Sequence, residues 1–281
     1  VSAGVYFVIR IYPIVVASEV TSGLVAIVGG FTALMTALIG LVQKDIKRVL
    51  AYSTMSQLGY MFLALGALGY AAGAFHLINH AYFKAGLFLG SGSVIVALHH
   101  EQDMRRMGGL AKFMPITFAT FFACALSLMG IPPFSGFWSK DEVLASVFSR
   151  AIEAGGFWWL LFVFGEITAL ITALYMTRLL ILSFAGRYRG NDPPPEDYLL
   201  DKRRLEKQQI EWEIKKYGQS LGGLATLYAE PEPALATVIA DGGTLEHQGS
   251  SYVHSYSSAH GHLPRESPWV ITVSLIVLAL F

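Results

Sequence analysis

Hydrophobic residues occur along this chain in long runs that are separated by short polar turns. A helix needs about 20 mostly apolar residues to cross the hydrocarbon core of a bilayer. Runs that meet this requirement lie at residues 21–42, 49–69, 74–98, 115–148 and 157–184. The pattern therefore predicts an all-α fold, a polytopic bundle of transmembrane helices.

The segments between and around these runs divide the chain into four parts. Residues 1–17 have the composition of the end of a transmembrane helix, and residues 18–189 contain the five spans. Residues 190–265 are polar and are expected to form a largely disordered loop on the cytoplasmic side. Residues 266–281 are expected to begin a further transmembrane helix. Because the sequence lacks an initiator Met and stops inside an apolar run, we expect a fragment of a larger membrane protein.

Composition and charge support the membrane interpretation. The chain is 54% hydrophobic and only 14% charged, against about 25% charged residues in an ordinary soluble domain. Cytoplasmic loops of membrane proteins are enriched in Lys and Arg. If the five spans cross in turn, one side holds only Arg10 and Arg150. The other side collects Lys44, Lys47, Arg48, Arg105, Arg106, Lys112, Arg187 and Arg189. The charge bias and the number of spans therefore agree.

Three titratable residues interrupt the third apolar run. His76, His80 and Lys84 stand four residues apart in "FHLINHAYFKAGLFLGSG". Each step of four advances about 6 Å along a helix and rotates about 40°, so the three side chains form a ladder about 12 Å long on one face. A charge at the bilayer centre costs about 2.5–3.5 kcal/mol, so such groups normally face a protein interior or a water-filled path.

The ladder has two interpretations. Imidazole titrates near neutral pH. Burial disfavours the charged form of a lysine, and a nearby carboxylate or water favours it, so a lysine subject to both gains and loses a proton at working pH. The three residues therefore offer successive proton stations. In the alternative, they only form hydrogen bonds to neighbouring helices, as polar residues in membranes often do. For one histidine we would favour the structural role, but three residues in register favour proton or cation transfer.

A break is expected in the fourth apolar run, at "GIPPFSGFWSKDE". Pro132 and Pro133 cannot donate backbone hydrogen bonds and disfavour a continuing helix. Broken helices at membrane depth are tolerated where they line a cavity, and in transporters they often mark the ion path. Lys140 follows the break and is a candidate proton carrier; in the alternative, the prolines end the span at a surface loop and Lys140 is solvated.

The residues around Lys140 suggest how the helix restarts. Ser139 followed by Glu142 matches the capping-box pattern, which places the new helix start at Ser139. Asp141 and Glu142 would then lie at the positive end of the helix dipole. We expect these two acids to tune the proton affinity of Lys140.

A polar stripe is expected on the second run, within "QKDIKRVLAYSTMSQLGYMFLALG". Ser53, Gln57 and Tyr60 recur at intervals of four and three and share one helix face. Such a stripe can carry ordered water toward the middle of the membrane. Asp45 and Lys47 precede it, either as interfacial anchors or at the mouth of that path.

Three motifs carry a resemblance to a known family. "DIKRVLAYSTMSQLGYMFLALG", "FHLINHAYFKAGLFLGSGSVI" and "GIPPFSGFWSKDEVL" resemble, in this order and spacing, the antiporter-like membrane subunits of respiratory complex I. The stretch "HHEQDMRRMGGL" at 99–110 resembles the L-type branch of that family, the counterpart of mitochondrial subunit five. The resemblance covers residues 1–189 and resumes near residue 264.

The resemblance implies a proton-translocating subunit of NADH:quinone oxidoreductase, built on two inverted five-helix repeats of which this fragment keeps the second. It implies that Lys84 is the central proton carrier with His76 and His80 beside it, and that Lys140 is the terminal carrier. Asp45 and Lys47 fall on family positions implicated near the channel. The first repeat would precede Val1, and a long lateral helix would follow Phe281.

Partners and cofactors follow from the same resemblance. We expect the other membrane-arm subunits of complex I and the lipid bilayer as partners, no nucleic acid, and a multi-pass location in a bacterial inner (plasma) membrane. No glycine-rich dinucleotide fingerprint follows a strand, and the single Cys124 cannot ligate a cluster. We therefore expect no cofactor in this chain, with NADH, FMN, iron–sulfur clusters and quinone held by partner subunits.

Two rival functions remain open from the sequence. An A-type component of a multi-subunit Na⁺/H⁺ antiporter shares the "HxxFKA" helix and the broken helix, although the 99–110 stretch favours complex I. A purely structural membrane subunit would tolerate Met or Gln at Lys84 and Lys140 without loss of transport.

Overall fold

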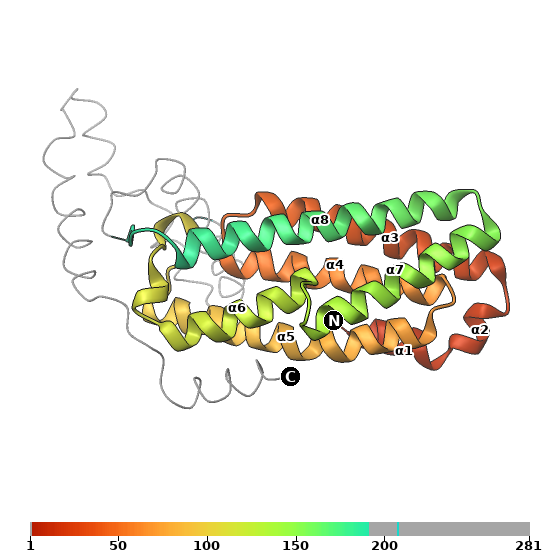
Figure 1. Ribbon diagram of the computed structural model, residues 1–281, viewed down its shortest axis with the longest axis horizontal. Helices are drawn as coiled ribbons and strands as arrows, with labels where there is room; N and C mark the ends of the chain where they lie inside the picture. The colour runs from red at the N-terminus through yellow and green to blue at the C-terminus, as the bar shows by residue number, and fades with distance from the viewer. Residues whose placement is uncertain (1, 191–206, 208–281) are drawn as a thin grey trace, which may run out of the picture. The chain divides into compact units, whose positions relative to one another are not determined.

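The computed structural model describes residues 2–190 and residue 207 (Figure 1). Throughout the described part the chain is helical, and the pairing of Asp45 with Asp103 is an isolated bridge rather than a strand. Two 3₁₀ turns, Met104–Arg106 and Leu110–Lys112, precede α6. The α-helices are α1 (Ala3–Arg10), α2 (Tyr12–Val16), α3 (Glu19–Val42), α4 (Ile46–Gly66), α5 (Tyr70–Ala97), α6 (Pro115–Met129), α7 (Ser135–Ala154) and α8 (Phe157–Phe184).

The all-helical transmembrane bundle expected from the apolar runs is confirmed. The long helices lie roughly along the long axis of Figure 1, and each predicted span corresponds to α3, α4, α5, the α6–α7 pair or α8. Of these, α3 and α8 are long and apolar enough to cross a membrane by length and composition alone. The predicted loop at 190–265 and the helix at 266–281 lie outside the described residues, apart from Gly190 and Lys207.

The helix break predicted at the prolines is present between α6 and α7. α6 begins at Pro115, a position that proline favours, and ends where Gly130 adopts a left-handed conformation with φ 80°. The hydroxyl of Ser127 in α6 accepts a hydrogen bond from the backbone N–H of Gly136 in α7 at 3.0 Å. The two half-helices are therefore joined side to side as well as through the turn.

Glycines bring α3 and α4 into close contact. A Cβ atom at Gly29 would meet the α4 backbone at Leu63 and Gly59, and one at Gly59 would meet the α3 backbone at Ala33. Small residues at such contacts let helix backbones approach in membranes, where packing rather than hydrophobic transfer drives association. α4 is thereby fixed against α3 on one face and free to present its polar residues on another.

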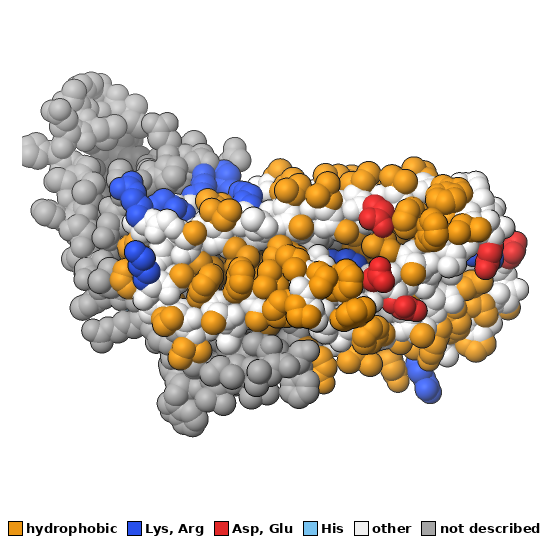
Figure 2. All heavy atoms as spheres, in the orientation of Figure 1, with side chains coloured by type: hydrophobic (Ala, Val, Ile, Leu, Met, Phe, Trp, Pro, Cys, Tyr) orange, Lys and Arg blue, Asp and Glu red, His pale blue; other side chains and the backbone are white. Residues whose placement is uncertain are grey.

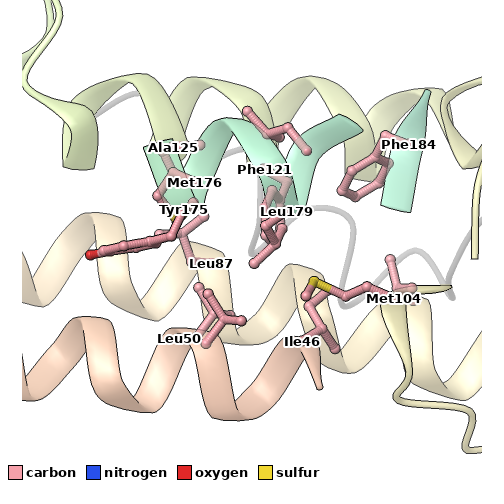
Figure 3. Close-up of a cluster of buried hydrophobic side chains, with 14 of the residues drawn as sticks. Ile46, Leu50, Leu87, Met104, Phe121, Ala125, Tyr175, Met176, Leu179 and Phe184 are labelled. Carbon is pink, nitrogen blue, oxygen red and sulfur yellow. The ribbon is translucent and has the colours of Figure 1, made fainter. Parts of the chain in front are cut away.

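The largest cluster of buried apolar side chains packs α4, α5, α6 and α8 together beside the loop at 99–107. Figure 3 shows Ile46 and Leu50 of α4, Leu87 of α5, Phe121 of α6 and Leu179 of α8 in this cluster. Tyr175 is part of the same cluster, and its hydroxyl oxygen extends away from the apolar side chains (Figure 3). The apolar packing therefore ends against a polar region.

Basic side chains gather at one end of the bundle, as the alternating charge pattern predicts. Figure 2 shows Lys and Arg at the end where α8 finishes. At this end, the loop before the first 3₁₀ turn is bound to the start of α4, because Ile46 N–H donates to Gln102 O at 3.1 Å and Met104 N–H donates to Lys44 O at 3.0 Å. Arg189 donates to the backbone oxygens of Met104 and Arg105, so the loop also holds the chain that follows α8.

Candidate proton-transfer site

The three ladder residues of α5 face the interior of the bundle, as predicted. His76 is 1% exposed, and His80 and Lys84 are each 5% exposed. α5 packs against α4, α6 and α7. The ladder therefore lies on the face of α5 that these helices cover.

Lys84 shares its hydrogen-bond acceptor with another side chain. Its Nζ donates to the backbone oxygen of Leu50 in α4 at 3.2 Å, and the hydroxyl of Thr54 donates to the same oxygen at 2.9 Å. Lys84 and His80 also line a cavity of about 700 Å³ between α1, α4 and α5. The Lys84 residue therefore borders a cavity.

Lys140 binds a carbonyl that the helix break leaves available. Its Nζ donates to the backbone oxygen of Leu128 at 2.8 Å. Leu128 lies in the last turn of α6, where carbonyls lack a helical N–H partner, and the chain turns away at Gly130 before two prolines that have no N–H to offer. The Lys140 Nζ also lies 5.8 Å from the centroid of the Tyr60 ring. The broken helix thus supplies the acceptor for the lysine that follows it.

His76 is hydrogen-bonded through both ring nitrogens. Nε2 lies 3.1 Å from Oε1 of Gln57 in α4, and Nδ1 lies 2.9 Å from Oγ of Ser139 in α7. The ring centroids of His76 and His80 are 6.4 Å apart, and those of His76 and Tyr60 are also 6.4 Å apart. His76 therefore connects the polar stripe of α4, the ladder of α5 and the helix that carries Lys140.

The predicted stripe of α4 is buried along its whole length. Ser53, Gln57 and Tyr60 are each 0% exposed. The Tyr60 hydroxyl donates to the backbone oxygen of Gly165 in α8, and the Ser53 hydroxyl accepts a hydrogen bond from Tyr175 of α8 at 2.7 Å. The stripe thus contacts α8 at two points and His76 at a third.

α8 contributes polar groups that the sequence analysis missed. The Thr172 hydroxyl lies 3.5 Å from that of Tyr175, and Thr168, Thr172 and Tyr175 are all buried. These residues follow one another at intervals of four and three, the spacing that identified the α4 stripe. A search of the most apolar helices for that spacing would have found them.

Two buried nitrogens in the site have unused hydrogen-bonding capacity. Nε2 of His80 and the side-chain nitrogen of Gln57 have no hydrogen-bond partner among the described residues. The His80 ring is surrounded by aromatic groups, with its centroid 5.5 Å from that of Phe83. Buried polar groups normally find a partner, so these two nitrogens are points where the cluster can accept another hydrogen-bonding group.

The predicted capping box at Ser139 is wrong. α7 begins four residues earlier, at Ser135, with Phe134 as its N-cap, and its first turn contains no acidic residue. The chain becomes helical again soon after the prolines, so Ser139 lies in the second turn and directs its hydroxyl to His76. Asp141 and Glu142 are exposed on the outside of α7, and their effect on Lys140 stays a prediction.

Asp45 and Lys47 lie at the basic end of the bundle. Asp45 is the N-cap of α4, where its carboxylate accepts hydrogen bonds from the N–H groups of Lys47 and Arg48 at 2.7 and 3.1 Å. The Lys47 side chain is exposed. The structure therefore explains Asp45 as a helix cap, and the role of both residues at a channel mouth stays a prediction.

The arrangement contains groups suited to moving protons. Two amines, two imidazoles, an amide and several hydroxyls are buried together across four helices, and many of them are within hydrogen-bonding distance of a neighbour. The amines and imidazoles can each exist with or without an added proton, and hydroxyls both donate and accept. Such a set can transfer protons without a cofactor of its own.

Comparison with known proteins identifies relatives of this chain. The chain is 41% identical over 288 residues to the NAD(P)H-quinone oxidoreductase chain 5 of Synechocystis, in an alignment that covers all of this chain and 37% of the relative. It is 50% identical over 208 residues to chain 5 of Picosynechococcus, covering 71% of this chain and 30% of the relative. The chain therefore spans about a third of the length of these relatives.

Two solved structures share the fold. The membrane-bound sulfane sulfur reductase, an archaeal respiratory membrane complex, gives a TM-score of 0.61 at 25% identity, covering 93% of this chain and 31% of that one. The Mrp complex of Dietzia gives a TM-score of 0.67 at 23% identity, covering 98% of this chain and 46% of that one. The family profile described as NADH:quinone oxidoreductase/Mrp antiporter, transmembrane, matches residues 1–172. The chain belongs to the NADH:quinone oxidoreductase/Mrp antiporter family of transmembrane proteins.

Proposed function

We propose that this chain is the proton-translocating part of a membrane subunit of NADH:quinone oxidoreductase. The observation that carries the proposal is the burial of Lys84 and Lys140 beside a hydrogen-bonded group in which His76 joins Gln57 of α4 to Ser139 of α7. The similarity to proteins named as chain 5 of that oxidoreductase supports the same conclusion. A purely structural subunit has no need of two buried amines, whose burial in the membrane is costly.

In the proposed mechanism, electron transfer from NADH to quinone takes place in partner subunits that hold NADH, FMN, iron–sulfur clusters and quinone. Other membrane-arm subunits transmit that reaction to this chain as a change in the surroundings of Lys84. The Lys84 proton then moves by way of His80 and His76 toward Lys140, and the path is refilled along Ser53, Gln57 and Tyr60. Moving one charge against 100 mV costs about 2.3 kcal/mol, which is comparable to the cost of burying a charge.

The proposal includes an orientation in the membrane. Residues 18–189 form five crossings, with the α6–α7 pair as one broken crossing, and the basic end of the bundle faces the cytoplasm of a bacterial cell. Asp45 and Lys47 lie at that end, so protons enter the path from the cytoplasmic side. The second five-helix repeat of the family's architecture corresponds to this segment.

Lys84→Met tests the proposal in the full-length protein within its complex. NADH oxidation and proton uptake are recorded together in inverted membrane vesicles, with Lys112→Met as a matched control because Lys112 is an exposed lysine at the basic end. We expect Lys84→Met to lose nearly all proton uptake and the control to retain it. Normal uptake by assembled Lys84→Met complex would show that the ladder is structural.

A second function has support from the family and the fold. The family includes Mrp antiporters, and the Dietzia Mrp complex has the same fold as this chain. In a component of a Na⁺/H⁺ antiporter, a sodium gradient imposed on vesicles without NADH would drive proton movement, and Lys84→Met would abolish it. In the oxidoreductase, proton uptake requires NADH and persists without sodium.

A further inference from the structure

Ser139 connects the helix of the histidine ladder to the helix of Lys140. Its Oγ lies 2.9 Å from Nδ1 of His76 and 3.4 Å from the backbone oxygen of Gly136, one turn earlier in α7. Ser139 is 0% exposed and immediately precedes Lys140. We propose that Ser139 is a positioning residue whose hydroxyl turns between His76 and Gly136 as His76 gains and loses a proton. This inference rests on the proposed function.

The neutral state of His76 is set by Gln57. The Oε1 atom of Gln57 can only accept a hydrogen bond, so the Nε2 atom that it contacts carries the hydrogen. Nδ1 of a neutral imidazole is then an acceptor, and the Ser139 hydroxyl donates to it. Ser139 and Gln57 together therefore select one of the two tautomers of His76.

The protonated state requires the Ser139 hydroxyl to turn. An imidazolium donates from both nitrogens, so Nδ1–H now donates to the lone pair of Ser139 Oγ. The serine hydrogen must point elsewhere, and the backbone oxygen of Gly136 is the acceptor within reach at 3.4 Å. His76 can thus change its charge while each of its nitrogens keeps a partner and the heavy atoms stay in place.

The surroundings of His76 show why this hydroxyl matters. Among the described residues, the charged or titratable groups around His76 are Tyr60 on α4, His80 on α5 and Lys140 on α7. The Lys140 ammonium lies over the ring of the same Tyr60. Tyr60 donates its hydroxyl to Gly165, and no contact with Nδ1 of His76 is seen for these groups among the described residues. Ser139 is therefore the group that can hydrogen-bond Nδ1 of His76 in either charge state.

Ser139→Ala removes both roles of the hydroxyl, and Ser139→Thr keeps them. Ser146→Ala is the matched control, since the Ser146 hydroxyl on the same helix donates to the backbone oxygen of Glu142 and not to a residue of the site. In inverted vesicles we expect Ser139→Ala to lower proton uptake per NADH oxidised about tenfold, because a buried donor loses its partner. We expect Ser139→Thr to recover most of it and Ser146→Ala to match the wild type.

A double variant separates positioning from packing. If Ser139 acts through His76, Ser139→Ala causes no further loss of proton uptake in a His76→Gln background, and ¹⁵N spectra of labelled histidine show that Nδ1 of neutral His76 loses its hydrogen bond in Ser139→Ala while Gln57 keeps the hydrogen on Nε2. An equal loss in both backgrounds, or unchanged uptake with Ser139→Ala, would overturn the inference. If Lys84→Met still loses uptake in that case, the proposed function stands; normal uptake by Lys84→Met would overturn the function itself.

Discussion

Lys84 and Lys140 are buried to the same extent but are held in different ways. Lys140 binds the carbonyl of Leu128, which the end of α6 leaves without a helical partner. Lys84 binds the carbonyl of Leu50 in the second turn of α4, and that oxygen also accepts a hydrogen bond from the Thr54 hydroxyl. Lys84 borders a cavity of about 700 Å³. If the two lysines carry protons as proposed, the comparison favours Lys140 as a fixed carrier and Lys84 as a movable one.

The strongest test of this difference replaces each lysine with arginine. A guanidinium is larger than an ammonium and stays charged, so neither variant can release a proton, and proton uptake is lost in both. We expect Lys140→Arg also to lose most of the assembled complex, because the carbonyl of Leu128 and the Tyr60 ring hold the ammonium closely. Lys84→Arg has a cavity beside it and should assemble. Native gel electrophoresis of membranes measures assembly. Equal amounts of the two assembled variants would show that Lys84 and Lys140 are not held differently.

A smaller effect is expected from Gly130→Ala, which disturbs the acceptor of Lys140 alone. Gly130 has φ 80°, where a residue with a Cβ costs about 1–2 kcal/mol, and the added atom would lie 3.5 Å from the Lys140 side chain. We expect proton uptake to fall about tenfold as the Leu128 carbonyl shifts. Gly155→Ala is the control, because Gly155 also has positive φ but its added Cβ meets no atom within 4 Å. An equally large loss of proton uptake in Gly155→Ala would show that the effect of Gly130→Ala comes from general destabilisation.

The smallest effect is expected from Thr54→Val, which leaves the Leu50 carbonyl without the threonine hydroxyl. Lys84 would then be the only side chain bound to that oxygen among the described residues, and firmer binding should slow its release by about twofold. Thr36→Val removes a similar hydroxyl bond within α3, from Thr36 to the Thr32 carbonyl, and serves as the control. Stopped-flow measurement of proton uptake distinguishes the two variants. A faster rate in Thr54→Val would show that the shared carbonyl does not restrain Lys84.

The sequence predicted the residues of the site better than their partners. Helical spacing was enough to place the α5 ladder and the α4 stripe on buried faces, because polar groups in a membrane-spanning helix avoid lipid. The prolines were enough to predict a break. The acceptors of both lysines are backbone oxygens, and any residue type at positions 50 and 128 would provide one, so the sequence carries no sign of them.

The error at Ser139 has a related cause. A capping-box pattern describes local hydrogen bonding at a helix start, and the sequence satisfied it at Ser139 and Glu142. In the structure, α7 starts at Ser135, where Ser135 lies 3.3 Å from the Ser127 hydroxyl of α6. Contacts between α6 and α7 therefore decided where the helix begins, and a local pattern could not include them.

The close fit between α3 and α4 has a mechanical consequence. With Gly29 and Gly59 allowing each backbone to meet the other, neither helix can slide or roll without collision. On the proposed function, α3 and α4 would therefore act as one rigid unit, and the polar stripe of α4 would keep one direction while protons move. On that function, we expect any movement that opens and closes the path to come from α5 and α7, the helices that carry the two lysines.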